Sequence, residues 1–582
     1  MRLKRISKAV AAGAALGLML SACAPADEGG EAGQGGGETA QVESIATTVG
    51  PNEFISYNGF TPETYSTYNS AIVDRLKVGF SYFDGEGVLQ PNTDLGSYEM
   101  VSEDPMVIEY TINDNAAWSD GTPITVADVV MAWGVQNAEM TNADGDPLFN
   151  SVSQDMGTDV PEGPQGEPDG KTFTVEFAAP NPDWQLLTWL LDPAHVVAEQ
   201  AGISTEDLVT AIREGDAEAL APVAEFWNTG WNTNPGELPE ESMVPVSGPY
   251  KLKSWEPGQS VTLEANEEYY GEAMAPQNDE LVFRFVAPDA MVQALENGDV
   301  NVIEPQATVD TLDQLEGIGD AVNVHQYDTL IWEHLDFNFG EGSVFADNLE
   351  LREAFAMCVP RQQIVENLIQ PLNPEAQVMN LREYFPFQDE YSEVEEYAYD
   401  GRYDEADVEG AKEILEANDA VGTEVRIGYS APNPRRTDEV AMIKSSCDEA
   451  GFVIEDAGNA DFFEPGGTQE RGDYEVALFA WAGSGQIVSG ENIYATDNPQ
   501  NYGQYSNEEV DALWEEVRTS VDPEVHMEAK KDIEKILWDD LFGIPLFAHP
   551  GVGASSASIE NVQGTPTQNG IVWNAYEWNR AE

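Results

Sequence analysis

Basic side chains are scarce in this chain. It holds 26 Lys and Arg against 106 Asp and Glu, a formal net charge of −80 at pH 7. Phosphate backbones and anionic lipid surfaces would repel such a chain, so nucleic acid is excluded as a partner and charge cannot hold the protein to a membrane. Because 42% of the residues are hydrophobic and 10% are aromatic, the sequence is rich enough in apolar side chains for a folded core and is not a disordered acidic tail.

Motifs of catalysis and metal binding are also missing. The sequence contains no HExxH, CxxC, Walker A or Gly-x-Ser-x-Gly pattern. The stretch from Asn142 to Asp146 resembles the start of a calcium loop, but its glycine stands fourth rather than sixth, which excludes an EF-hand. The five histidines stand singly, at His195, His325, His334, His526 and His549. We therefore expect no enzyme activity, no cofactor and no metal site; a secreted hydrolase is the alternative, which a hydrolysis assay would detect.

Only three cysteines occur, and the first of them ends a hydrophobic N-terminal segment. A basic start is followed by an apolar run from Ala9 to Leu20 and then by LSAC, which ends at Cys23. The run is short for a membrane-spanning helix, and a small-residue cleavage site before Cys is what lipid attachment requires. We predict a lipoprotein signal peptide over residues 1–22, acylation of Cys23, and a flexible tether over residues 23–41. A plain secretory signal or an uncleaved anchor is the alternative.

Residues 108–133, IEYTINDNAAWSDGTPITVADVVMAW, are the most informative stretch of the chain. Polar and apolar side chains alternate up to Ile112, as in a half-buried strand, and Ser119 to Gly121 is a turn sequence. Thr125 is a good N-cap, and Asp128 three residues later can complete a capping box with it. The apolar residues that follow Thr125 have the spacing of an amphipathic helix. The string WSDGTPIT, followed by ADVV and an aromatic residue, resembles the signature of the family 5 extracellular solute-binding proteins of ABC importers, a group that includes oligopeptide, dipeptide and nickel binders.

The resemblance continues in order through nearly all of the mature chain. It is carried by SGPYKLKSWEPGQSVTLEANEEYYG at 247–271, QALENGDVNVI at 293–303, LDFNF at 335–339, LREAFAMCVPRQQIV at 351–365, and later helices at 409–417 and 508–541. Strand-like and helix-like runs alternate, which is typical of mixed α/β proteins. The resemblance implies an α/β, two-lobe, periplasmic-binding-protein-like fold of type II, with an extra domain inserted in the first lobe.

The same resemblance implies three domains. Domain I is expected at residues 42–76, 240–330 and 546–582, the inserted domain II at 77–239, and domain III, the second lobe, at 331–545. The chain is expected to cross between the lobes near Leu335 to Asn338 and near Ile544 to His549, because both stretches are short and apolar with few charges. A buried strand inside either lobe would have the same pattern.

Two short segments match the positions where peptide binders of this family hold an extended ligand between the lobes. One runs from Tyr65 to Asn69, before a helix expected at Ile72 to Phe80. The other runs from Ala480 to Ser484, after a strand expected at Tyr474 to Phe479. The expected ligand-binding residues are Tyr65, Thr67, Asn69, Trp481, Ala482, Gly483 and Ser484. A tryptophan of the core is the alternative interpretation of Trp481.

The position of Ser484 departs from the pattern of peptide binders. An Asp commonly stands three residues after the tryptophan in those proteins, where its carboxylate pairs with the free ammonium of the peptide. A hydroxyl cannot replace a charge-assisted hydrogen bond in strength. Either another acid supplies the charge, with Asp461, Glu464 and Glu491 as candidates, or the ligand has no ammonium there.

The other two cysteines, Cys358 and Cys447, follow apolar residues at helical spacing in what would be the same lobe. An exported protein meets an oxidising environment, so we expect a disulfide between them. Two separately buried thiols are the alternative.

The expected function is therefore that of a substrate-binding lipoprotein of an ABC importer, lipid-anchored at the extracellular side of the cell membrane. Its expected solute is an oligopeptide, its expected partners are the permease subunits in the membrane, and it is expected to be a monomer. A glycan, a modified peptide or a chelated metal is the alternative solute. An envelope lipoprotein of the same fold with no role in transport is the alternative outside this class.

Overall fold

The computed structural model describes residues 43–187, 191–464 and 466–581. The predicted signal peptide, the predicted tether and Cys23 lie outside the described residues. Among the helices that are described, none combines the length and the apolar character needed to cross a membrane.

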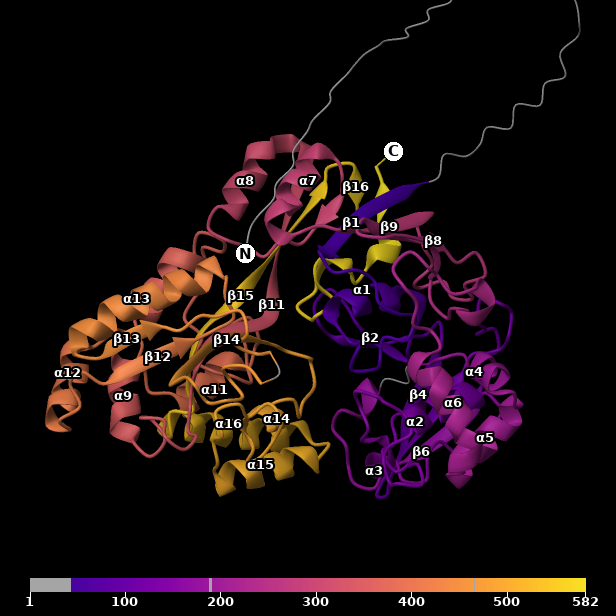
Figure 1. Ribbon diagram of the computed structural model, residues 1–582, viewed down its shortest axis with the longest axis horizontal. Coiled ribbons are helices and arrows are strands. Elements are labelled where there is room, and N and C mark those ends of the chain that lie inside the picture. The colour runs from indigo at the N-terminus through magenta and orange to yellow at the C-terminus, as the bar shows by residue number, and fades with distance from the viewer. Residues whose placement is uncertain (1–42, 188–190, 465, 582) are drawn as a thin grey trace, which may run out of the picture. The chain divides into compact units, whose positions relative to one another are not determined.

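A ten-stranded mixed sheet runs through the described chain (Figure 1). Its two central strands, β11 (Val322–Phe337) and β15 (Gly543–Ser556), are also its longest and pair antiparallel. The strand order is β13-β12-β14-β11-β15-β10-β1-β9-β8-β7. The other strands of this sheet are β1 (Ser44–Gly50), β7 (Tyr250–Glu256), β8 (Ser260–Ala265), β9 (Glu280–Phe285), β10 (Val302–Ile303), β12 (Glu424–Gly428), β13 (Val453–Asp456) and β14 (Val476–Ala482).

β11 changes its neighbours near its middle. Residues 322–328 pair only with β15, whereas residues from Ile331 onward also pair with β14. The ladder between β11 and β15 is interrupted between Asp328 and Trp332, opposite residues 548–550. The first expected crossing, at residues 335–338, begins where β11 is paired on both sides, with β14 and with β15. A strand buried in this way is apolar for the same reason as a crossing between lobes. The second expected crossing, at residues 544–549, ends at the interruption of the ladder. The domain boundaries stay a prediction.

The signature motif folds as its sequence predicts. Its strand is β5 (Met106–Ile112) and its helix is α2 (Val126–Val135). The Thr125 hydroxyl accepts a hydrogen bond from the backbone N–H of Ala127 (3.3 Å), and the Thr125 N–H donates to the Asp128 carboxylate (2.8 Å). β5 lies between two antiparallel neighbours, β4 (Gly96–Glu103) and β6 (Thr172–Glu176). The helices nearby in sequence are α3 (Met156–Asp159), α4 (Ala194–Ala201), α5 (Thr205–Glu214) and α6 (Ala217–Thr229).

Helix α1 (Thr67–Leu76) begins and ends earlier than predicted. The hydroxyl of Ser66 accepts a hydrogen bond from the backbone N–H of Asn69 (3.2 Å), so a serine N-cap starts the helix before its apolar residues begin. The helix ends because Lys77 has an extended backbone. The other elements of this part of the chain are β2 (Ser81–Phe83), β3 (Leu89–Pro91), α7 (Met291–Asn297), α8 (Thr311–Ile318), β16 (Ile559–Glu560) and β17 (Asn579–Arg580).

Residues beyond β11 add helices around β12, β13 and β14. These helices are α9 (Leu349–Cys358), α10 (Arg361–Ile364), α11 (Tyr391–Ala398), α12 (Val408–Ala417), α13 (Pro434–Ala450), α14 (Glu491–Tyr494), α15 (Glu508–Arg518) and α16 (Pro523–Asp539). A disulfide joins Cys358 at the end of α9 to Cys447 in α13, with the two Cα atoms 5.0 Å apart. Strand β14 starts and ends later than predicted, so Trp481 is part of the strand rather than of the segment after it.

Candidate functional site

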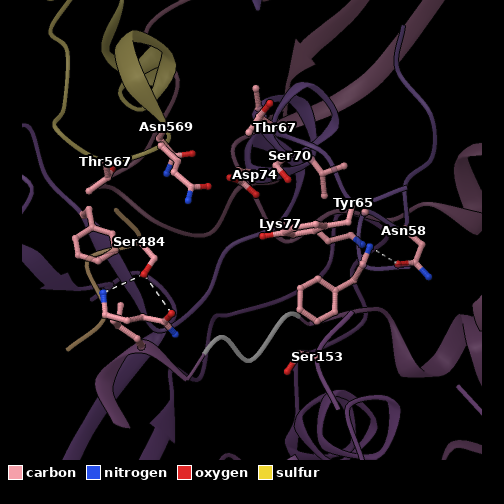
Figure 2. A pocket seen from close by; sticks show the side chains of 18 of the residues that line it. Asn58, Tyr65, Thr67, Ser70, Asp74, Lys77, Ser153, Ser484, Thr567 and Asn569 are labelled. Atoms are coloured by element: carbon pink, nitrogen blue, oxygen red, sulfur yellow. Dashed lines mark hydrogen bonds between the residues drawn. The ribbon is translucent and has the colours of Figure 1, made fainter. Parts of the chain in front are cut away.

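Two cavities adjoin one another on either side of the segment that follows β14. The first has a volume of about 490 Å³ and is lined by α1, by the loops at residues 58–60 and 567–569, and by β2 (Figure 2). The second has a volume of about 740 Å³ and is lined by β11, β14 and the segments before α11 and within α16. Ser484, Gln486 and Gln568 line both cavities. The two cavities are therefore neighbours, and each has a size that suits a bound small molecule.

The structure brings most of the predicted ligand-binding residues to these cavities. Tyr65 and Thr67 line the first cavity, and Ser484 lines both. Trp481, Ala482 and Gly483 line the second. The two predicted segments, more than 400 residues apart in sequence, thus meet at one site.

Asn69 is the predicted residue that lines neither cavity. Because α1 begins at Thr67, Asn69 points inward and is fully buried. Its side-chain oxygen accepts a hydrogen bond from the N–H of Ile55 (3.0 Å), and its side-chain nitrogen donates to the carbonyl of Ser56 (3.2 Å). Asn69 therefore holds the preceding loop in place, and its prediction as a ligand-binding residue is not supported by its position.

Trp481 belongs both to an aromatic layer and to the cavity wall. Its ring stacks on that of Tyr502 (centroids 5.6 Å apart, planes inclined by 30°) and lies edge-on to that of Phe479 (5.0 Å). The residue is partly exposed, but its indole N–H is buried and has no hydrogen-bond partner within the described part of the chain. Packing therefore fixes the ring, and Trp481 lines the cavity with the exposed part of its side chain.

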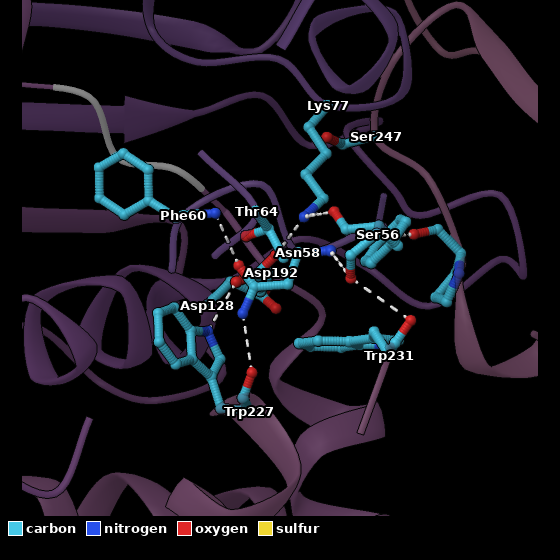
Figure 3. A network of polar contacts seen from close by, with 12 residues as sticks. Ser56, Asn58, Phe60, Thr64, Lys77, Asp128, Asp192, Trp227, Trp231 and Ser247 are labelled. Carbon is cyan, nitrogen blue, oxygen red and sulfur yellow. Dashed lines mark hydrogen bonds and ion pairs between the residues drawn. The ribbon is translucent and has the colours of Figure 1, made fainter. Parts of the chain in front are cut away.

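The cations that line the two cavities are already paired with acids. In the first cavity, Lys77 Nζ lies 2.5 Å from Asp192 Oδ1 and donates to the carbonyl of Tyr57 (2.9 Å) (Figure 3). Asp192 also accepts a hydrogen bond from the indole of Trp227 (2.9 Å). In the second cavity, Arg382 pairs with Glu534 (3.1 Å) and Lys530 with Glu383 (3.0 Å). Among the described residues, no Lys or Arg of the two cavity walls is left without an acidic partner.

Asp74, on α1, is an acid of the first cavity that sequence reasoning missed. Its side chain is exposed to the cavity, and no hydrogen bond or ion pair joins it to another described residue. Restricted hydration raises the pKa of its carboxyl above the ordinary value, although the charges of Arg75 and Lys77 act to lower it. Asp74 also lines a third cavity, of about 290 Å³. The three acids proposed from sequence, Asp461, Glu464 and Glu491, line neither of the first two cavities.

The C-terminal segment contributes the other unpredicted lining residues. Thr567, Gln568 and Asn569 reach the first cavity, and the Thr567 hydroxyl is buried without a hydrogen-bond partner among the described residues. Nothing in the local sequence marks this loop, because its place depends on contacts with residues far away in the chain. One such contact is the hydrogen bond from the N–H of Leu330 to the carbonyl of Pro566 (2.8 Å).

The signature motif itself is structural. The indole N–H of Trp118 (3.3 Å) and the backbone N–H of Ala194 (3.0 Å) both donate to Oδ1 of Asp128. The backbone N–H of Thr125 donates to Oδ2 of the same carboxylate. Burial raises the pKa of Asp128 to about 6, against the effect of these hydrogen bonds. None of Trp118, Thr125 and Asp128 lines a cavity described above. The motif therefore identifies the fold and does not contact a solute in these cavities.

No group of three or more His, Cys, Asp or Glu within the described residues could hold a metal ion. The arrangement offers polar and aromatic walls around two neighbouring cavities, which are suited to binding a solute.

Comparison with known proteins agrees with this geometry. The model of the bacterial extracellular solute-binding proteins, family 5, middle part, matches residues 90–503. A lipoprotein of Mycobacterium tuberculosis strain H37Rv, named as uncharacterized, is 25% identical over 560 residues, which cover 93% of this chain and 94% of the relative. The oligopeptide-binding protein OppA of the same strain is 24% identical over 482 residues, which cover 81% of this chain and 73% of the relative.

Solved structures share the fold over nearly the whole chain. The periplasmic EDTA-binding protein EppA matches with a TM-score of 0.79 at 23% identity, covering 94% of this chain and 98% of the other. The oligopeptide-binding protein AppA of Bacillus subtilis, in complex with a nonapeptide, matches with a TM-score of 0.67 at 16% identity, covering 93% and 100%. The matched family model spans well over half of the chain, and the chain therefore belongs to the bacterial extracellular solute-binding proteins of family 5, which bind solutes for ABC transporters and are not enzymes.

Proposed function

We propose that this protein captures an oligopeptide for an ABC importer. The observation that carries the proposal is the pair of adjoining cavities, with Ser484, Gln486 and Gln568 in both walls. An extended chain could occupy both cavities, with its side chains entering the two volumes in turn. Polar and aromatic side chains both line the cavities, which suits hydrated and tolerant peptide pockets.

The pairing of the cavity cations supports a peptide over a multiply charged anion. EDTA carries several negative charges at neutral pH, and the described walls hold no Lys or Arg that is free to neutralise them. Releasing one of these cations from its buried partner would leave an acid uncompensated, which is costly. The EDTA-binding relative is therefore a guide to the fold and not to the solute.

A glycan is the second candidate, because Trp332 and Trp481 both line the second cavity. Trp332 is nearly buried, but the partly exposed ring of Trp481 offers apolar surface that a sugar could contact. The two candidates differ in the polar groups that they bring to the first cavity, where a peptide has an ammonium and a neutral glycan has none.

The proposal also includes a lipid anchor on Cys23 and permease subunits as the partner. Acylation of Cys23 would hold the protein at the extracellular face of the membrane, where it would deliver its solute to permease subunits as a monomer. Support comes from the lipobox sequence and from the mycobacterial relative that is named a lipoprotein. Binding would close the protein about the interruption of the β11–β15 ladder, with domains as given by the predicted boundaries.

Mass spectrometry of the solute that co-purifies with the protein tests the proposal. We expect peptides of several residues that are released on denaturation. Adding such a peptide to emptied protein should lower the radius of gyration measured by small-angle X-ray scattering, because a ligand that contacts both sides favours the closed state. A bound glycan, or a failure of a peptide mixture to bind, would refute the proposed solute.

A further inference from the structure

Asp74 is the acid of the first cavity that has no bonded partner among the described residues, whereas Asp192 in the same wall is paired with Lys77. The side chain of Asp74 is exposed to the first cavity. The two cations that follow it closely in sequence are committed elsewhere. Arg75 donates to the carbonyl of Val572 (2.5 Å), and Lys77 is held by Asp192 and the carbonyl of Tyr57.

The surroundings of Asp74 favour a cation. Asp74 lies in the last turn of α1, where the free carbonyl groups of a helix carry a partial negative charge. Phe60, Tyr65 and Phe83 line the same cavity, and the faces of aromatic rings attract ammonium and guanidinium groups. A carboxylate, a helix C-terminus and aromatic rings thus converge on one volume.

A well-hydrated acid on a helix surface is the simpler interpretation of Asp74, but its surroundings argue against it. Its carboxyl lines two cavities rather than an open surface, and desolvation raises its pKa. Because Asp74 has no bonded partner among the described residues, a positively charged group in the first cavity would gain a charge-assisted hydrogen bond there.

We propose that Asp74 receives a cationic group of the solute, an ammonium or a guanidinium, on the α1 side of the first cavity. The inference rests on the proposed function, because it takes these cavities as the place where the solute binds. For a peptide, the free amine would dock against α1, in the cavity that Ser484 also lines. The solute class is then cationic or zwitterionic, and polyanions are excluded.

Two panels of probes test the inference on purified protein. The first is a digest of short peptides, one half with free amines and the other half fully acetylated and isotope-labelled, with capture read by mass spectrometry. The second is a set of non-peptide alkylamines and guanidines, read by calorimetry. Wild-type protein should retain free-amine over acetylated peptides. Asp74→Asn should weaken binding of the free-amine peptides about tenfold or more while binding of acetylated peptides changes little, because a charge-assisted bond is lost.

Two further variants separate charge from structure. Asp74→Glu keeps the charge and should retain much of the preference for free amines. Asp313→Asn removes an exposed acid from α8, which lines neither cavity, and should leave the preference unchanged. A melting temperature of Asp74→Asn equal to or above that of the wild type would show that loss of binding is not loss of folding.

The outcomes distinguish the inference from the proposed function. Peptides bound without preference for a free amine, or a preference that survives in Asp74→Asn, would overturn the role of Asp74 and leave the peptide proposal intact. Alkylamines bound in an Asp74-dependent way, with no peptide bound, would support the role of Asp74 and overturn the peptide proposal. Binding of neither panel would overturn both.

Discussion

Several of the basic residues of this acidic protein are buried and paired inside it. Arg361 is fully buried and donates to the carbonyls of Pro545 (3.0 Å) and Met379 (2.7 Å). Arg382 and Lys77 are nearly as buried and are paired with acids. These three cations therefore bind groups inside the protein rather than on its surface.

Asp192→Asn tests the energetic importance of one such pair. The substitution leaves the ammonium of Lys77 buried without a counter-charge, since both side chains are less than 10% exposed. We expect the free energy of unfolding to fall by about 3–5 kcal/mol, measured by urea denaturation. Lys535→Met, which breaks an exposed pair with Asp539, is the control and should cost less than about 1 kcal/mol. Equal effects of the two substitutions would contradict the importance of burial.

Ser484→Asp should create the acid that peptide binders commonly have at this place. We expect the affinity for a free-amine peptide, relative to its N-acetylated form, to rise by about tenfold, because a charge replaces a dipole. Titration calorimetry on the matched peptides measures this ratio. The double variant Asp74→Asn/Ser484→Asp should regain part of the preference lost in Asp74→Asn. An unchanged ratio in both variants would mean that Ser484 does not face the solute.

The residues of the site differ in how well the sequence predicts them. Trp481 and Ser484 could be found because they lie at the end of a strand and just after it, in a recognisable order along the chain. Asp74 could not, because it is one of 106 acids and its helix position alone predicts a solvated surface. Its special environment comes from residues 567–569, which fold back from the far end of the chain.

The elements that meet at the interruption of the β11–β15 ladder enclose a buried charge network. Glu333 on β11 is fully buried, with Nε2 of His549 (2.8 Å), Arg436 (2.6 Å) and Arg435 (3.2 Å) around its carboxylate. Burial would raise the pKa of Glu333, but these partners outweigh it and hold the pKa well below the usual range. Glu439, next to Arg435, has a raised pKa because it is buried and lies near Glu333.

His549→Gln should change the pH dependence of stability. Burial, and the nearby charge of Arg435, lower the pKa of His549 from 6.5 to about 4, against the effect of Glu333. Between these pH values the unfolded chain binds a proton that the folded protein excludes, so this residue destabilises the fold as pH falls from about 6.5 to 4. Over this pH range, the titration of His549 lowers the free energy of unfolding by about 3 kcal/mol.

The measurement is the difference in unfolding free energy between wild type and His549→Gln across this pH range, by urea denaturation. Glutamine keeps a donor toward Glu333 without titrating, and Glu439 titrates in both proteins, so its opposite contribution cancels in the difference. The wild type should lose stability relative to the variant as pH falls. A difference that does not vary with pH would refute the depressed pKa of His549.

The disulfide between α9 and α13 gives a second prediction for the elements. It closes a sequence separation of 89 residues, and both cysteines are fully buried. Replacing both by alanine should lower the free energy of unfolding by about 2–5 kcal/mol. In a Cys23→Ala background, the denatured and unreduced protein should show no reactive thiol. Two labelled thiols would mean that the pair is not joined in the protein.

Local signals predict some helices better than others. The cap of α2 is visible in the sequence because Thr125 and Asp128 stand three residues apart, just before a run of valines. The start of α1 is not, because Thr67, Tyr68 and Asn69 are weak helix formers that the Ser66 cap and the buried Asn69 amide hold in place. Tertiary contact, rather than propensity, decides this helix.

At the scale of the whole molecule, the negative charge and the proposed lipid have opposite effects on attachment to a membrane. An acidic surface is repelled by an anionic membrane, so the lipid on Cys23 would supply all of the attachment. Cys23→Ala should therefore release the protein from the membrane fraction into the medium, still able to bind solute. Fractionation and a binding assay check both parts. Retention of the variant in the membrane would point to an uncleaved N-terminal helix.

The continuous ten-stranded sheet also restricts how this protein can be divided. β11 and β15 pair with each other across the interruption, with β14 beside one half of β11 and β10 beside the far half of β15. A cut at residue 330 would end β11 midway and a cut at residue 549 would end β15 midway. Either cut would separate β10 from its partner residues in β15, and unpaired strand edges favour aggregation. A separately expressed half is therefore expected to aggregate rather than fold, so the two sides of the proposed hinge have to be made as one chain.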